Sequence, residues 1–161
     1  MPSLVNPMDA FKTFEPALKR GELKVQQGDT DPNLLVHLDH PMGEMRITYA
    51  KMRGESVGAI AMIINAEPFE GKPVFQIGYA VPQHLRKRGL GKEIAQAAIA
   101  EFTAGMARNG MKSFYIEAIV GIRNIASQKV AEQVIGGPTK EVADEHSGEA
   151  ALQYMRKIEA A

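Results

Sequence analysis

Short apolar runs separated by turn residues dominate the first half of the chain. Residues 34–40 (LLVHLDH), 45–52 (MRITYAKM) and 57–66 (VGAIAMIINA) have the length and residue types of strands. The intervening segments HPMGE and RGES contain turn residues, so the pattern predicts an antiparallel meander. A fourth run, KPVFQIGYAVP, should end at Pro82 because proline lacks the N–H that a strand ladder needs.

An amphipathic pattern before these strands predicts a short N-terminal helix. Asp9 is suited to capping it, Phe11 and Phe14 are spaced to face the protein, and Gly21 should end it. Residues 22–33, which include QQGDTDPN, are expected to form a loop.

Two further helices are predicted in the second half of the chain. One follows Gly91, ends at Asn109-Gly110 and carries apolar residues at three-to-four spacing, namely Ile94, Ala98, Phe102 and Met106. The other is NIASQKVAEQVIGG, residues 124–137, which ends in glycine.

The order of the elements indicates the fold class. SFYIEAIVG (113–121) is expected to be a buried fifth strand, and residues 139–158 should form two strands around an EHSGE turn. Helix, strands, helix, strand, helix and strands together predict a mixed α/β sheet. At 161 residues the chain is expected to form a single domain, 1–161, with one sizeable core.

The overall charge excludes a general attraction to polyanions. Nineteen Lys and Arg residues balance nineteen Asp and Glu residues, so no field draws the chain to nucleic acid or an anionic membrane. There is no cysteine, hence no disulfide and no thiolate metal site, and no metal is expected. The start, MPSLVNPMDAFKTF, lacks the pattern of a signal peptide. These features predict a soluble cytoplasmic protein.

One local basic cluster stands out against this neutral background. Residues 86–92 (RKRGLGK) lie between the fourth strand and the start of a helix. A helix N-terminus leaves N–H groups unpaired and favours anions, and glycine allows a phosphate to approach the backbone closely. A solvated basic turn is the alternative interpretation. Neither the Walker loop nor the G-x-G-x-x-G dinucleotide motif fits, since Glu93 follows Gly91-Lys92 and Ile94 replaces the last glycine.

Three segments together resemble a known enzyme family. Residues 86–91 (RKRGLG) match the pattern Q/R-x-x-G-x-G/A, QIGYAVP is similar to the strand before it, and residues 124–137 resemble a later helix that opens with N-x-x-S. From about residue 34 to 158 the chain resembles the GNAT superfamily of acetyl-CoA-dependent N-acetyltransferases. The resemblance implies a mostly antiparallel mixed sheet flanked by helices, with strands four and five splayed apart.

The resemblance also implies a donor site for acetyl-CoA. Backbone amides of residues 88–92 would hold the pyrophosphate, the main chain of Ala80 and Val81 would pair with the pantetheine arm, and the N–H of Val81 would face the thioester carbonyl. The implied residues are Ala80, Val81, Arg86, Lys87, Arg88, Gly89, Leu90, Gly91, Lys92, Asn124 and Ser127.

The chain departs from the family at both expected proton-transfer positions. Gln76 stands where many relatives have a glutamate base, and Ala131 stands where relatives often have a tyrosine acid. Glu117, His84, Glu149 or a chain of water molecules could serve as the base instead. Ser127 resembles the serine of the N-x-x-S motif and could protonate the thiolate or merely bond its own helix. Packing accounts for Tyr79 and Tyr154, and Tyr154 is a more distant alternative acid.

The acceptor is expected to enter through acidic segments. In the family it lies opposite the cofactor, between the N-terminal helix, residues 65–72 and residues 143–150. These loops contain the acidic residues Glu67, Glu70, Asp144, Glu145 and Glu149. Their negative charge suits a cationic amine, although loops in contact with solvent are often acidic without any such role. A small-molecule amine or a protein N-terminus could be the acceptor, with no nucleic acid or membrane partner, and a homodimer is possible.

Three functions therefore remain to be compared. The first is an N-acetyltransferase that uses acetyl-CoA in a ternary complex. The second is an acyl-CoA-binding sensor or partner module without catalysis, suggested by Gln76 and Ala131. The third is nucleic-acid binding through RKRGLGK, which the zero net charge and the lack of aromatic residues in that stretch disfavour.

Overall fold

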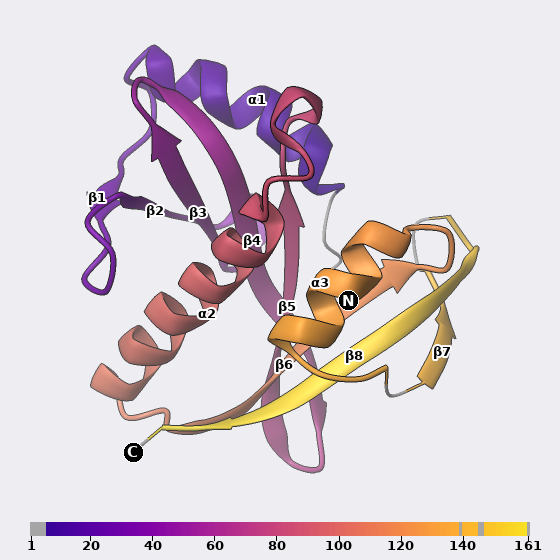
Figure 1. Ribbon diagram of the computed structural model, residues 1–161. Helices are drawn as coiled ribbons and strands as arrows, with labels where there is room; N and C mark the ends of the chain where they lie inside the picture. Colours follow the sequence, from indigo (N-terminus) through magenta and orange to yellow (C-terminus); the bar gives the residue numbers. More distant parts are fainter. Residues whose placement is uncertain (1–5, 139, 145–146, 161) are drawn as a thin grey trace.

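The computed structural model describes residues 6–138, 140–144 and 147–160. These residues form one eight-stranded sheet, in the order β1-β2-β3-β4-β5-β6-β8-β7, with three α-helices (Figure 1). The strands are β1 (Gln26–Gln27), β2 (Leu34–Asp39), β3 (Arg46–Arg53), β4 (Ser56–Phe69), β5 (Lys72–Ala80), β6 (Ser113–Gly121), β7 (Lys140–Ala143) and β8 (Ala150–Glu159). The helices are α1 (Pro7–Lys19), α2 (Leu90–Arg108) and α3 (Ile125–Val134). No helix within this part of the chain is long and apolar enough to cross a membrane.

The predicted antiparallel meander is confirmed. Strands β2 to β5 pair in sequence order, each antiparallel to the next. Two boundaries differ from the prediction. The two-residue strand β1 lies within residues 22–33, which were expected to be loop, and β4 continues to Phe69, so much of the expected loop 65–72 is a strand arm. The turn before β8 is closed by hydrogen bonds of Asp144 and Gly148, while Glu145 and His146 lie outside the described residues.

The splay between the fourth and fifth predicted strands is present between β5 and β6. These strands run parallel, and their pairing covers only Val74–Gln76 against Tyr115–Glu117. Beyond Gln76 and Glu117 the two strands have no mutual register, and β6 continues as the antiparallel partner of β8 as far as Gly121. The sheet therefore opens into a V whose apex is the Gln76–Glu117 pair.

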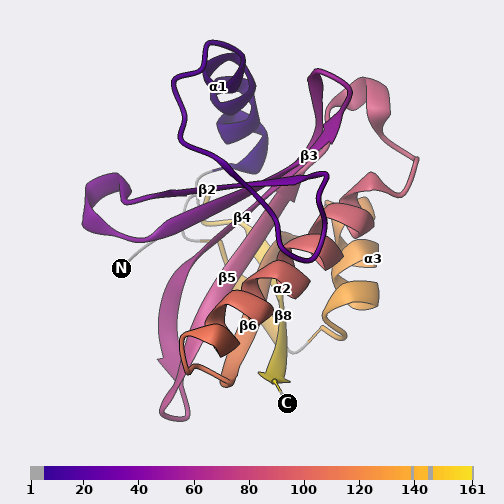
Figure 2. The same cartoon turned by 90° about the vertical axis from the view of Figure 1, so that its left-hand side faces the viewer.

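The helices cover the two faces of the sheet separately. In both views α2 and α3 lie over one face, and α1 lies on the other (Figures 1 and 2). The larger apolar cluster joins α2 and α3 to the sheet, and a smaller one joins Phe11 and Phe14 of α1 to the opposite face. Asp9 does not cap α1, because the Oδ1 of Asn6 accepts the bond from the N–H of Met8 at 2.9 Å and Asp9 lies in the first turn.

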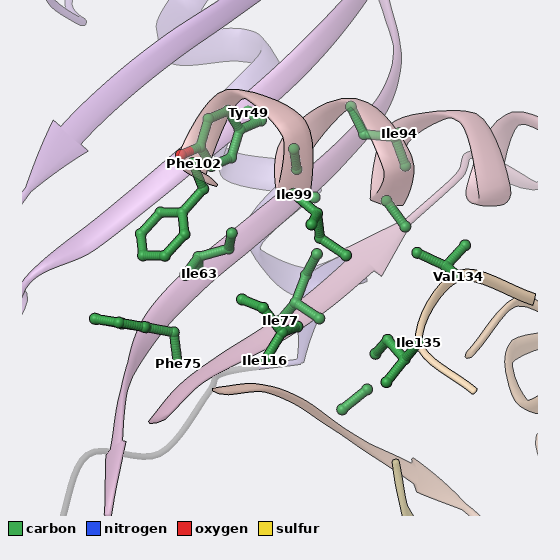
Figure 3. Packing of buried hydrophobic residues seen from close by; sticks show 14 of the residues in the cluster. Tyr49, Ile63, Phe75, Ile77, Ile94, Ile99, Phe102, Ile116, Val134 and Ile135 are labelled. Carbon is green, nitrogen blue, oxygen red and sulfur yellow. The ribbon is translucent and has the colours of Figure 1, made fainter. Parts of the chain in front are cut away.

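Three phenylalanines form the centre of the larger cluster. Phe102 of α2 packs edge-on against Phe75 of β5, with ring centroids 4.7 Å apart, and each ring lies 5.5 Å from Phe114 of β6. Figure 3 shows Phe102 with Ile63, Phe75 and other apolar side chains beneath α2. Aromatic pairs in this geometry gain energy beyond the area they bury. This packing fixes α2 over the strands that form the V.

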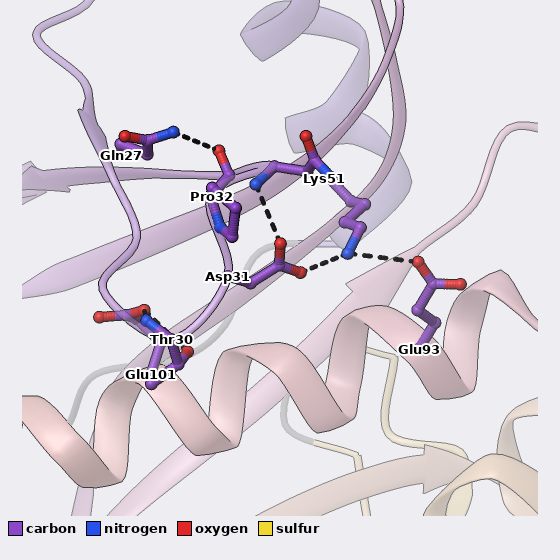
Figure 4. A network of polar contacts seen from close by, with 8 residues as sticks. Gln27, Thr30, Asp31, Pro32, Lys51, Glu93 and Glu101 are labelled. Atoms are coloured by element: carbon purple, nitrogen blue, oxygen red, sulfur yellow. Dashed lines mark hydrogen bonds and ion pairs between the residues drawn. The ribbon is translucent and has the colours of Figure 1, made fainter.

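A second set of contacts attaches the loop before β2 to α2 (Figure 4). Glu101 is buried and accepts hydrogen bonds from the N–H and the hydroxyl of Thr30, both at 2.9 Å. Lys51 of β3 pairs with Asp31 of the loop, and its Nζ lies 3.5 Å from Oε1 of Glu93 in the first turn of α2. The loop is thus held along the helix by polar contacts.

Removing the ring of Phe102 should destabilise the fold strongly. Phe102 is almost fully buried, so Phe102→Ala should lower the free energy of unfolding by about 3–5 kcal/mol through lost burial and a residual cavity. Urea denaturation measures this change. Met42→Ala is the control, because Met42 is fully exposed and its removal should change stability by less than about 0.5 kcal/mol. Equal effects of the two substitutions would contradict the packing described.

Stability should fall in acid partly through Glu101. Burial favours the neutral carboxyl, but hydrogen bonds from Thr30 and the Asp29 backbone and the charge of Arg108 outweigh burial and lower the pKa of Glu101. A lowered pKa in the native state stabilises the fold above the ordinary pKa of glutamate, and this contribution is lost as the pH falls through the native value. Glu101→Gln should therefore be less stable than the parent at pH 7.

The difference between the parent and Glu101→Gln should shrink as the pH falls from about 5 to 3. Denaturation midpoints measured across that range test it. Glu55→Gln, at an exposed turn, is the matched control. A difference from the parent that stays constant with pH would show that Glu101 contributes by shape alone.

Candidate active site

The segment between β5 and α2 leaves a row of backbone amides without partners among the residues that the structure describes. Lys87 and Gly89 both have left-handed backbone conformations, with φ of +65° and +76°. Glu93 is the first residue of α2 whose N–H is bonded, to the carbonyl of Gly89 at 3.1 Å. Within the described residues, no acceptor faces the N–H groups of residues 87–92. We call residues 86–92 the amide cradle.

Cations surround the cradle although the helix dipole disfavours them there. Arg86, Lys87, Arg88 and Lys92 are exposed at the positive end of α2. Arg86 turns back, and its Nε donates to the carbonyl of Val81 at 3.1 Å. The other three have no ion pair with any described residue. Free amides and unpaired cations at one point suit an anionic group such as a phosphate.

Gly91 connects the cradle to the strand and to α3. A Cβ added at Gly91 would lie 3.7 Å from Cγ2 of Val130 and 3.9 Å from Cγ2 of Val81. The start of α2, the end of β5 and one side of α3 therefore meet at this glycine. From there β5 and α3 lead together toward the opening of the V.

A pocket of about 1,090 Å³ occupies the V. Its walls come from the splayed ends of β5 and β6, the start of α3, the start of α1, the β4–β5 hairpin and the β7–β8 hairpin. The lining includes Asn6, Asp9, Glu67, Gln76, Gly78, Tyr79, Glu117, Ala118, Asn124, Ser127, Lys140, Asp144, Glu149 and Gln153. The start of α1, on one face of the sheet, and the start of α3, on the other, both contribute to this lining.

Glu117 lies at the apex of the V. It pairs with Gln76 as the last matched position of β5 and β6, and both residues line the pocket. Gln153 of β8 is buried and donates from Nε2 to Oε2 of Glu117 at 2.6 Å. Of the other predicted base candidates, Glu149 lines the pocket at the hairpin, whereas His84 lies exposed in the short turn before the cradle and outside the lining.

Two hydroxyl groups lie where α3 and β5 face each other across the pocket, those of Ser127 and Tyr79. Asn124 is the N-cap of the helix, and its Oδ1 accepts a hydrogen bond from the N–H of Ser127 at 3.1 Å. The Ser127 hydroxyl makes no hydrogen bond to the described part of its own helix. Tyr79 reaches across from β5, and its hydroxyl donates to the carbonyl of Ser127 at 2.9 Å. Burial, opposed by the Ser127 bond and assisted by nearby Tyr154, raises the pKa of Tyr79 to about 12.

Two buried residues lie behind this wall. Ala131, where relatives often have a tyrosine, is packed in the larger apolar cluster and offers no polar group. Tyr154 of β8 is also fully buried, and its hydroxyl has no hydrogen-bond partner among the described residues. The predicted packing role fits the ring of Tyr154 but leaves its hydroxyl unexplained.

The acidic acceptor segments are only partly brought together. Glu67, Asp144 and Glu149 line the pocket, but Glu70 does not, and Glu145 lies outside the described residues. Sequence reasoning missed Asp9 and Gln153 as lining residues and the contact between Tyr79 and Ser127. The sequence did contain one indication for Tyr79. It precedes Val81, a predicted donor-site residue, by two positions, and side chains two positions apart lie on the same face of an extended segment.

Comparison with known proteins places this arrangement in a structural class. No model of a protein family matches the sequence, and no curated protein matches it. Solved structures do match. The ribosomal-protein-S5-alanine acetyltransferase from Vibrio fischeri superposes with a TM-score of 0.54 at 13% identity, over 72% of this chain and 62% of that protein.

Two further structures agree with this match. RimL, a ribosomal L7/L12 alpha-N-protein acetyltransferase solved with coenzyme A, gives a TM-score of 0.54 at 20% identity over 72% of this chain and 64% of its own. A GNAT-family acetyltransferase from Streptococcus pneumoniae gives 0.52 at 17% identity over 70% and 66%. The chain thus spans less than two thirds of the length of these three proteins. The fold of this chain is that of the GNAT acetyltransferases, as the resemblance of its sequence implied.

Proposed function

We propose that this protein is an N-acetyltransferase that transfers the acetyl group of acetyl-CoA to a primary amine. The observation that carries the proposal is the continuity of the site. Unpaired amides of the cradle lead through the contact of Gly91 with Val81 and Val130 to the pocket in the V. A donor with a diphosphate at one end and a thioester at the other fits such a path.

The donor site would use the main chain more than side chains. Amides of residues 88–92 hold the diphosphate, and Lys87, Arg88 and Lys92 neutralise it. The groups of β5 beyond Gln76 that point into the V lack a partner strand, so they are available to an extended pantetheine arm. At Val81, just after β5, the N–H is the group offered to the arm, because the carbonyl accepts a hydrogen bond from Arg86. Asn124 and Ser127 form the opposite side of this channel.

The acetyl-transfer step needs an oxyanion donor and a base. The N–H of Val81 is the donor for the thioester oxygen, a contribution of several kcal/mol where water is excluded. Glu117 is the base, replacing the glutamate that Gln76 does not supply. Its place at the apex of the V and the hydrogen bond from Gln153, which fixes the carboxylate, support this role.

The acceptor would enter from the face covered by α1. Asp9, Glu67 and Glu149 line that side and attract a cationic amine, with Lys140 as a basic residue in the same lining. The structural neighbours named for ribosomal proteins make a protein N-terminus one acceptor class to test. A small polyamine is another, since a spermidine N-acetyltransferase SpeG chimera from Vibrio cholerae also matches the fold.

An acyl-CoA-binding module without catalysis is the second candidate. Gln76 and the buried Ala131, which cannot transfer a proton, favour it. A panel containing spermidine and a short peptide with an N-terminal alanine separates the two candidates. Steady release of free thiol with either amine supports the enzyme, and binding of acetyl-CoA without any release supports the module.

Coenzyme A should stabilise the intact chain and not a variant with a blocked cradle. At a concentration 100 times the Kd, binding adds about 2.7 kcal/mol, which corresponds to a rise in Tm of roughly 5–10 °C. Gly91→Glu should abolish the rise because its carboxylate occupies the anion site. The fold should survive, since the added Cβ meets only ordinary contacts at 3.7 and 3.9 Å.

Gly105→Glu is the matched control for this experiment. It makes the same change in the same helix, where the added Cβ would meet only the Arg108 side chain at 3.6 Å. This variant should keep the full thermal shift. No shift with the intact chain would refute the donor site.

Replacing Glu117 should slow turnover without weakening the donor complex. Glu117→Gln should lower kcat about 10²–10⁴-fold with the amine acceptor that gives the highest rate in the panel, because an amide cannot accept the amine proton. The thermal shift with coenzyme A should be unchanged. Glu70→Gln is the control, since Glu70 is exposed and outside the pocket lining. An unchanged kcat in Glu117→Gln would assign the base elsewhere.

A further inference from the structure

The proposed reaction leaves one charge without an assigned partner. When the C–S bond breaks, the electron pair stays on sulfur, and α3 offers no acidic side chain at Ala131. A developing thiolate in a partly enclosed channel needs a hydrogen-bond donor. The Ser127 hydroxyl is one donor on this wall, and the structure contains a second.

The hydroxyl of Tyr79 lies where the channel enters the pocket. Tyr79 lies on β5 two residues before Val81, about 7 Å along the chain, and both side chains pack against the larger apolar cluster. Its hydroxyl crosses the channel to the Ser127 carbonyl at 2.9 Å, and both residues line the pocket. A donor arm that follows β5 and α3 from the cradle must pass this hydroxyl.

We propose that Tyr79 is a catalytic residue whose hydroxyl donates a hydrogen bond to the departing sulfur of the acetyl donor, an inference that rests on the proposed acetyltransferase function. The O–H need only rotate about its C–O bond, away from the Ser127 carbonyl and toward the sulfur. The ring and the strand keep their positions.

The acidities of the two groups decide between hydrogen bonding and proton transfer. The pKa of Tyr79 is raised to about 12, whereas an ordinary thiol has a pKa near 8.5. Transfer of the proton from tyrosine to thiolate would therefore be strongly uphill. The C–N bond forms first, and the C–S bond breaks when the tetrahedral oxyanion collapses. Tyr79 keeps its proton and stabilises the thiolate, and the amine proton accepted by Glu117 reaches the sulfur afterwards through water.

A second phenol, that of Tyr154, lies near Tyr79. It is fully buried and unpartnered among the described residues, on a ring that stands opposite Ala118 in the β6–β8 ladder. Tyr154 is close enough to Tyr79 for the two phenols to affect each other, and Glu132 is its other titratable neighbour. The Tyr154 hydroxyl makes no hydrogen bond to Tyr79, so the proposed role of Tyr79 does not depend on it.

Titration of the bound coenzyme A thiol tests the proposal without any acceptor. Thiolate absorbs in the ultraviolet, so the thiol pKa can be measured in the complex. With the parent protein it should lie about one unit below its value in the Tyr79→Phe complex, the shift expected for one lost hydrogen bond to an anion. Equal thiol pKa values in the two complexes would overturn the proposal.

Two control variants separate this role from a structural one. Tyr115→Phe removes a hydroxyl from a ring that packs on Phe69, outside the pocket lining. Gln128→Ala removes the bonds that Gln128 donates to the carbonyls of Gly121 and Ile122, and so loosens the start of α3 without touching Tyr79. Both complexes should keep the parental thiol pKa. If Gln128→Ala raised the thiol pKa as much as Tyr79→Phe does, the effect would come from the position of α3. That result would overturn the role of Tyr79.

Turnover gives an independent measurement. Tyr79→Phe should lower kcat at least tenfold with acetyl-CoA, and the loss should shrink with an acetyl thioester of a more acidic thiol, whose anion needs less stabilisation. A loss that is the same for both donors would count against the proposal. If the intact chain shows no thermal shift with coenzyme A, the donor site and the role of Tyr79 both fail. A normal shift with an unchanged thiol pKa rejects Tyr79 alone.

Discussion

The early end of the β5–β6 pairing is the constraint on which the site depends. Parallel strands normally satisfy their backbone groups along their full length, but here the ladder stops after Gln76 and Glu117. Past that point the backbone groups that face the gap must find water or a ligand, because buried peptide groups are rarely left unpaired. The same divergence creates the pocket and brings the start of α3 to its wall. The neighbouring amide cradle is supplied by the next element in the chain, since α2 begins within ten residues of the end of β5.

The larger apolar cluster holds β5 and β6 together on the side of the apex where the two strands are paired. Phe75 before the apex, Phe114 on β6 and Phe102 on α2 form one aromatic unit. The strands are thus fixed together below the apex and separated above it. Above the apex, polar side chains from three different strands line the same pocket. They are Glu117 on β6, Gln153 on β8 and Tyr79 on β5. This distribution compensates in the proposed mechanism for the positions that Gln76 and Ala131 leave without acid or base.

Much of the fold could be predicted from local patterns, and most of the site geometry could not. Strands β2 to β6 follow from apolar runs bounded by turns, and α2 follows from Gly89, Gly91 and the spacing of Ile94 and Phe102. The cap of α1 was assigned to Asp9, whereas Pro7 at the first helical position favours a start at Asn6. Contacts between distant segments carry no local signal.

The distant contacts explain what was missed. The Thr30–Glu101 bond joins residues 71 positions apart, and the Tyr79–Ser127 bond joins residues 48 positions apart. Each depends on how the sheet brings its elements together, which no window of the sequence contains. The cradle was predictable because its glycines, cations and helix start are consecutive. Residue types therefore predicted the amide cradle, while the wall of the pocket required three-dimensional placement.

The contacts of Lys51 have a consequence for how the cradle meets a ligand. Lys51 joins the loop before β2 to Glu93, one residue beyond the cradle, so the first turn of α2 is tied to the sheet at both its apolar and its polar side. The start of α2 is therefore already ordered when the chain has folded, and binding a ligand costs it little further conformational entropy. Affinity at the cradle should accordingly be limited by how well the ligand fits rather than by the entropy of arranging the helix end.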